Sequence, residues 1–134
     1  MALKLFMLML GGGAGAASRY FVTHFINNTY YGHALSSWGT LAVNLTGSFL
    51  LGIIFYMFQS APHLNHIYLF LAVGFCGAFT TFSTYALEIH NQLSAGLYKE
   101  AAISLLLNNI GCVAFVFAGI YLAKLAKGLL RGVL

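Results

Sequence analysis

Charged residues, and acidic residues above all, are scarce in this sequence. Its 134 residues include two acidic residues, Glu88 and Glu100, and six basic ones, whereas soluble domains carry roughly 25% charged residues. A chain with so few charges cannot cover its surface with polar groups, which excludes an ordinary water-soluble domain. The shortage of carboxylates also argues against a proton-coupled carrier, because such a carrier needs a titratable group inside the membrane.

Proline and cysteine are also scarce. The single proline, Pro62, lies in a polar stretch between two apolar runs, and Cys76 and Cys112 lie inside separate apolar runs. Spacing alone cannot establish a disulfide between these cysteines. The lysines and arginines are scattered along the chain and form no basic face, so we expect no nucleic-acid partner. Membrane lipid is the expected electrostatic partner.

What the sequence does contain is long apolar runs, with hydrophobic residues making up 60% of the chain. A helix needs about 20 mostly apolar residues to cross a bilayer. Four runs reach that length, at residues 3–26, 38–58, 67–89 and 101–125. Because the polar stretches between them are short, neighbouring helices should be antiparallel. The sequence therefore predicts an all-α membrane protein, with one domain of four transmembrane helices over residues 1–134.

The ends of the predicted spans carry two further signals. Lys4, an apolar run and the small residues 14–17 also imitate a secretory signal peptide, although we expect this segment to be retained as a span. Most of the basic residues fall on the side shared by both termini, which predicts cytoplasmic termini. The residues on that side are Lys4, Lys124, Lys127 and Arg131, against Lys99 and Arg19 toward the other side.

Polar residues inside the predicted spans are candidates for function, because burying them in a membrane costs free energy. They are Arg19, Thr40, Asn44, Thr46, Ser48, residues 80–84, Asn108 and Asn109. The densest group lies in the third run, where residues 74–85 combine two glycines with four hydroxyl residues. This composition predicts unwinding from Gly77 to Thr80, with carbonyls free to bind an alkali cation. Alternatively, the hydroxyls bond to carbonyls one turn earlier and only bend the helix.

Two further features could serve an anion. Phe82 and Tyr85 are three residues apart and so share one helix face, where their positive ring edges, together with donors such as Asn44, could meet a dehydrated anion. Ordinary aromatic packing is the alternative interpretation. Arg19 either extends to the lipid headgroups or holds positive potential at a pore mouth.

Taken together, three motifs resemble the Fluc (CrcB) family of fluoride channels. The first is Gly-Gly-Ala-Gly-Ala at residues 12–16, followed by Arg19 and Tyr20. The second is Gly-Thr-Leu-Ala-Val-Asn at residues 39–44, followed by Gly-Ser-Phe at 47–49, and the third is residues 74–85. The resemblance extends over all four predicted spans in their order.

The resemblance implies a fluoride-selective channel, not an enzyme, that passively exports toxic fluoride across the cytoplasmic (inner) membrane of a microbial cell. Two identical subunits would pack antiparallel as a dual-topology homodimer with two pores, and the third helix of each would be broken at mid-membrane. The implied pore residues are Asn44, Phe82, Ser83, Thr84 and Tyr85, with Arg19 at the vestibule. Carbonyls of Gly77 and Thr80 from both subunits would hold a structural sodium ion at the dimer centre.

The chain departs from the family pattern in three places. Tyr85 stands where a second phenylalanine is common, and its hydroxyl either donates to the ion or obstructs it. Cys112 stands where a serine is common. The bias of basic residues toward one side conflicts with equal insertion in both directions, so an oppositely oriented paralogous partner is an alternative. The rival functions are a small proton-coupled transporter using Glu88 and a membrane scaffold that binds helices through its glycine faces.

Overall fold

The computed structural model describes residues 1–28, 37–59 and 65–132. Within them, four helical segments are long and apolar enough to cross a membrane: Ala2–Ile26, Trp38–Phe58, Asn65–Ser94 and Tyr98–Leu129. The prediction of an all-α protein with four membrane helices is confirmed, although the third and fourth segments are longer than predicted. The chain is therefore a multi-pass membrane protein. The polar stretches predicted around His33 and Pro62 lie outside the described residues.

Two spans are single helices, and two are built from several helical pieces. The first span is α1 (Ala2–Ile26) and the second is α2 (Trp38–Phe58). The third span comprises α3 (Asn65–Tyr68), η3 (Leu69–Cys76), α4 (Gly77–Phe79) and α5 (Phe82–Ser94), and the fourth comprises α6 (Tyr98–Leu106), η4 (Leu107–Gly111) and α7 (Cys112–Gly132). The segments η3 and η4 are π-helical, with a wider turn than an α-helix.

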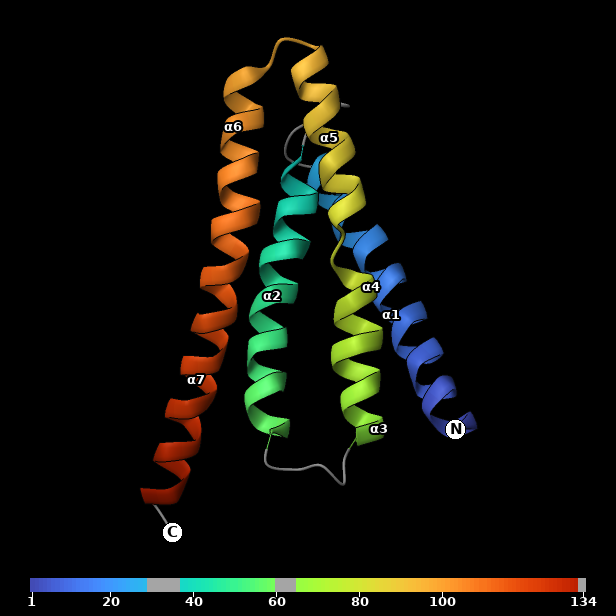
Figure 1. Ribbon diagram of the computed structural model, residues 1–134, viewed down its shortest axis with the longest axis vertical. Helices are drawn as coiled ribbons and strands as arrows, with labels where there is room; N and C mark the ends of the chain where they lie inside the picture. The colour runs from blue at the N-terminus through green and yellow to red at the C-terminus, as the bar shows by residue number, and fades with distance from the viewer. Residues whose placement is uncertain (29–36, 60–64, 133–134) are drawn as a thin grey trace.

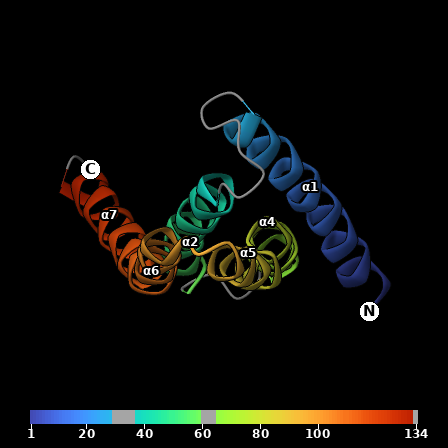
Figure 2. The same cartoon turned by 90° about the horizontal axis from the view of Figure 1, so that it is seen from above.

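The spans form an antiparallel bundle. The start of α1 and the end of α7 lie at one end of the bundle, and the α5–α6 connection lies at the other (Figure 1). Viewed from above, α2 lies centrally, with α7 on one flank and α1 beyond α4 on the other (Figure 2). The third and fourth spans thus approach α2 from different sides, and a polar site can form between them.

Glycines allow α2 and α7 to touch along their backbones. A Cβ atom built at Gly52 would collide with the carbonyl of Val116, and one built at Gly119 would collide with the carbonyl of Phe49. In lipid, where apolar side chains gain little by leaving the solvent, such close backbone packing is a main source of helix association. These two glycines fix the distance between the second and fourth spans.

A second glycine contact joins α1 to η3. A Cβ at Gly11 would collide with the carbonyl of Phe70, and a Cβ at Gly15 would collide with the carbonyl of Phe75. The two glycines form a small-xxx-small pair, and here the pair packs against a helix of the same chain. These contacts fix α1 against the third span, on the side of that span that faces away from α7.

The third span is interrupted at Thr80 and Thr81, which have extended backbones with φ, ψ of −84°, 158° and −151°, 120°. The predicted unwinding from Gly77 to Thr80 was placed too early in the chain. Gly77–Phe79 stays helical, and the Thr80 N–H still donates to the Cys76 carbonyl at 3.0 Å. Helix α5 then begins at Phe82, where the Thr81 hydroxyl accepts from the Thr84 N–H at 3.2 Å as an N-cap.

Candidate functional site

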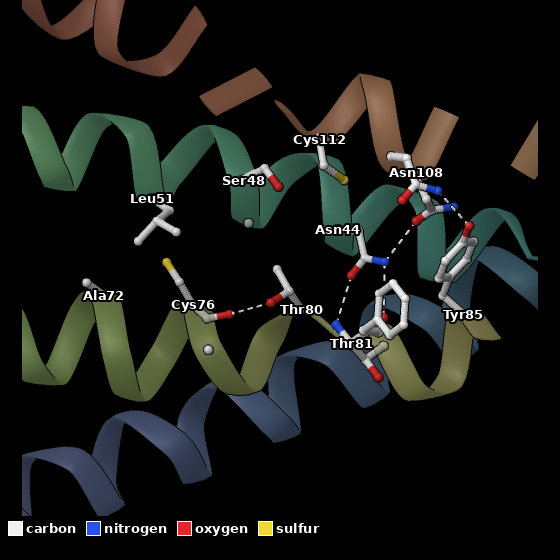
Figure 3. Close-up of a pocket in the computed structure, with 14 residues that line it drawn as sticks. Asn44, Ser48, Leu51, Ala72, Cys76, Thr80, Thr81, Tyr85, Asn108 and Cys112 are labelled. Atoms are coloured by element: carbon white, nitrogen blue, oxygen red, sulfur yellow. Dashed lines mark hydrogen bonds between the residues drawn. The ribbon is translucent and has the colours of Figure 1, made fainter. Parts of the chain in front are cut away.

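The interruption in the third span opens on a cavity of about 270 Å³ between α2, the third span and the fourth span. Figure 3 shows the side chains around it. The lining residues are Asn44, Gly47, Ser48, Leu51, Ala72, Cys76, Gly77, Thr80, Thr81, Phe82, Tyr85, Asn108, Asn109 and Cys112. None of these carries a charge, so any ion in the cavity meets only neutral groups.

Asn44 on α2 holds the interrupted segment in place. Its Oδ1 accepts from the Thr81 N–H at 2.8 Å, and its Nδ2 donates to the Thr81 carbonyl at 3.2 Å. The side chain is only 7% exposed. Extended backbone inside a membrane leaves polar groups that must find partners within the protein. The Asn44 side-chain amide satisfies both the N–H and the carbonyl of Thr81, and these two hydrogen bonds stabilise the interruption.

Asn108 on η4 orients that amide. Its Oδ1 accepts from Asn44 Nδ2 at 2.9 Å, while its Nδ2 donates to the Ser104 carbonyl at 3.1 Å. Because the Ser104 carbonyl requires a donor, Asn108 must present its oxygen to Asn44. The hydrogen bonds therefore link the second, third and fourth spans around one side of the cavity.

Asn109, the next residue on η4, contacts the third span separately. Its Nδ2 donates to the Tyr85 hydroxyl at 2.8 Å and to the Leu105 carbonyl at 2.8 Å. A π-helical turn rotates less per residue than an α-helical one, which brings two consecutive asparagines onto the cavity side. From the sequence, Asn108 and Asn109 could be identified as polar residues within a span, but no role could be predicted for them. Their partners depend on this turn, which composition does not predict.

Phe82 and Tyr85 both line the cavity, from the first turn of α5. Their ring centroids are 5.4 Å apart and their planes are inclined by 65°, an edge-to-face arrangement. Phe82 is 73% exposed in the single chain, whereas Tyr85 is 4% exposed. The spacing that suggested one shared helix face thus corresponds to a direct ring contact.

The remaining predicted site residues are placed in different ways. Gly77 and Thr80 line the cavity, but Ser83 and Thr84 are exposed and do not. The Thr81 hydroxyl donates to Thr84 Oγ1 at 3.0 Å and lies 3.5 Å from Ser83 Oγ, so these side chains form a hydroxyl cluster on α5. Arg19 lies beside the interruption, with its Nη1 donating to the Thr80 carbonyl at 3.4 Å.

Glu88 lies outside the cavity lining. Its Oε1 accepts a hydrogen bond of 2.6 Å from the Thr40 hydroxyl. This contact joins α5 to the start of α2, more than a turn away from Asn44 along that helix. The one carboxylate of the third span thus binds Thr40 of α2 and does not face the neutral cavity.

Comparison with known proteins identifies the family. Residues 6–120 match the family described as CrcB-like protein, Camphor Resistance (CrcB). Proteins named "Fluoride-specific ion channel FluC" from Leptospira interrogans and Methanocaldococcus jannaschii are 37% and 39% identical, each over 90% of this chain and 94% of the relative. A protein of the same name from Magnetococcus marinus is 36% identical over 92% of this chain and 99% of the relative. The chain therefore belongs to the CrcB family.

Proposed function

We propose that the chain is a fluoride-selective channel, not an enzyme, which passively exports fluoride across the cell membrane and so lowers fluoride toxicity. The observation that carries the proposal is the match, over nine-tenths of the chain, to relatives named as fluoride-specific ion channels. The neutral cavity at the interrupted third span supports it with a site for the ion.

The chemistry of the cavity suits a small anion. Fluoride loses a strong hydration shell when it enters a narrow path, and convergent hydrogen-bond donors must replace the lost water. Hydroxyls of Ser48 and Tyr85 and the rings of Phe82 and Tyr85 lie around one cavity, whereas the Thr80 hydroxyl already donates to the Cys76 carbonyl at 3.0 Å. Neutral donors bind an anion weakly enough to release it, which conduction requires. Asn44 lines the path and holds the segment that carries these groups.

The functional unit in this proposal is an antiparallel homodimer of dual topology. Phe82 is largely exposed in the single chain, and Ser83 and Thr84 form a polar cluster on the exposed side of α5. A second copy would cover these groups, so that the hydroxyls join a path lined by both subunits. Arg19, whose guanidinium lies beside Thr80, would draw anions toward the vestibule.

A structural sodium ion at the dimer centre also fits the residues present. In an uninterrupted α-helix the Thr81 N–H would be donated to the Gly77 carbonyl, but here it goes to Asn44. The Gly77 carbonyl is thus released, and space is open around Gly77. The Thr80 carbonyl accepts from Arg19 Nη1 at 3.4 Å and keeps a second lone pair for another partner. Carbonyl oxygens are suitable ligands for a hard cation. One chain supplies two such oxygens, and an antiparallel second copy would complete the site.

Proton-coupled transport is not favoured. The carboxylate required for it, Glu88, accepts from Thr40 and does not line the cavity. Fluoride flux through a channel should follow the fluoride gradient and the membrane potential alone. A proton gradient without a fluoride gradient should therefore produce no more fluoride accumulation than it does in protein-free vesicles, where neutral HF crosses the lipid.

Efflux from liposomes tests the proposal. Vesicles containing the purified protein are loaded with potassium fluoride or potassium chloride, valinomycin carries the counter-ion, and ion-selective electrodes record release. We expect rapid fluoride release, negligible chloride release, and no release of either ion from protein-free vesicles. Silence for both ions would contradict a channel formed by this chain alone, and equal release of both would contradict selectivity.

A further inference from the structure

The hydrogen bond between Asn109 and Tyr85 gives the tyrosine hydroxyl a defined direction. Asn109 Nδ2 lies 2.8 Å from the Leu105 carbonyl and 2.8 Å from the Tyr85 hydroxyl oxygen. A carbonyl oxygen can only accept, so the Asn109 atom that faces it must be the amide nitrogen. Flipping the amide would place two oxygens against each other. The tyrosine oxygen therefore receives a hydrogen from Asn109.

An accepting hydroxyl keeps its own proton for another partner. Asn109 uses its two amide hydrogens on Leu105 and Tyr85, and among the described residues no acceptor for the Tyr85 proton is found. Accepting a hydrogen bond polarises an O–H group and strengthens it as a donor. Both residues line the cavity, and Figure 3 shows the Tyr85 ring with its hydroxyl directed toward the fourth span.

We propose that Asn109 positions and polarises the Tyr85 hydroxyl so that it donates a hydrogen bond to the permeating anion. Tyr85 thus contributes a directed O–H donor in addition to its ring edge, and Asn109 is a positioning residue that acts through it. The inference rests on the proposed fluoride channel and deepens it by assigning one further donor of the path. It also decides between the two roles open to this hydroxyl, donation and obstruction.

The decisive variant is Tyr85→Phe, which removes the hydroxyl and keeps the aromatic ring. If the hydroxyl donates to the ion, fluoride efflux should fall roughly three- to tenfold, the effect of losing one hydrogen bond. If the hydroxyl obstructs the path, efflux should rise, and that result would overturn the proposal. Tyr121→Phe is the matched control, because Tyr121 is exposed on α7 and does not line the cavity.

A double-mutant cycle tests the role of Asn109. Asn109→Leu keeps the size of the side chain but removes its donor, and we expect a fall in efflux similar to that of Tyr85→Phe. In the Tyr85→Phe background the same change should have no further effect, because Asn109 acts only through the hydroxyl. Independent, multiplicative losses would show instead that each residue supports the fold separately, which contradicts the proposal.

A spectroscopic readout separates ion contact from a structural effect. A phenol that donates to fluoride absorbs at longer wavelength, so the near-ultraviolet difference spectrum of the purified protein, fluoride minus chloride, should show a tyrosine red shift. The shift should persist in Tyr121→Phe and vanish in Tyr85→Phe. Its survival in Tyr85→Phe would overturn the inference while leaving the channel intact. Absence of fluoride efflux from the unaltered protein would instead overturn the proposed function.

Discussion

The helices of this protein are joined in two contrasting ways. Between α2 and α7, Gly52 and Gly119 place backbone directly against backbone. Around the interruption, Asn44 and Asn108 join the spans through amide side chains and leave a cavity of about 270 Å³ beside them. The first contact brings the two backbones together at the glycines, and the second preserves space while satisfying the backbone that is exposed there. Rigid glycine contacts can therefore hold an open polar site in a small bundle.

The two kinds of contact should respond differently to substitution. A glycine contact has no room for a methyl group, so its loss should affect folding first. An amide bridge should tolerate a change of shape better than a change of charge, and its loss should affect transport first.

The largest effect is expected for the glycine contact. Gly52→Ala places a methyl group against the Val116 carbonyl, and overpacking of this kind costs about 1 to 3 kcal/mol or more where backbone must move. We expect little monodisperse protein in size-exclusion chromatography and a lower thermal unfolding midpoint. Gly12→Ala is the control, since a Cβ at Gly12 would meet no atom within 4 Å outside its own stretch of α1. Equal behaviour of the two variants would contradict the assigned contact.

A large effect on transport is expected for Asn44→Asp. The carboxylate cannot donate to the Thr81 carbonyl or to Asn108, and it adds a negative charge to a neutral cavity. We expect fluoride efflux from liposomes to fall by roughly two orders of magnitude or more. Asn91→Asp, at an exposed position near the end of α5, should transport normally. Efflux from Asn44→Asp equal to that of the unaltered protein would show that Asn44 does not face the path.

The smallest effect is expected at the start of α5. Thr81→Val removes the hydroxyl that accepts from the Thr84 N–H but keeps the backbone contacts with Asn44. Loss of an N-cap costs about 1 kcal/mol, so the thermal midpoint should fall by a few degrees in detergent. Thr46→Val, at an exposed position on α2, should leave the midpoint unchanged. An unchanged thermal midpoint in Thr81→Val would show that the Thr81 hydroxyl does not stabilise the start of α5.

The sequence predicts the spans better than it predicts the site. Apolar runs found four membrane helices because length and hydropathy decide whether a segment can cross a bilayer. The polar group at residues 74–85 also indicated an interruption. The exact position of the interruption, at Thr80 and Thr81, depends on Asn44. This residue lies 37 positions before Thr81 and accepts a hydrogen bond from its N–H. Local composition carries no information on that contact.

Contacts between residues on different spans could not be predicted from the sequence either. Phe82 and Tyr85 could be paired from their spacing, because both lie on one helix. Asn109 and Tyr85 lie 24 positions apart on different spans and meet where η4 widens. Polarity within a span was the available signal for Asn109, and it identifies a residue without naming its partner.

The connection between α5 and α6 has a consequence for how the chain enters the membrane. It consists of Ala95, Gly96 and Leu97, and Gly96 adopts a left-handed backbone with φ of 76° that reverses the chain at once. The neighbouring Lys99 and Glu100 carry opposite charges. During biosynthesis, the third and fourth spans can therefore be inserted as a hairpin with a short tip of no net charge, which opposes passage through the bilayer only weakly in whichever orientation carries it across.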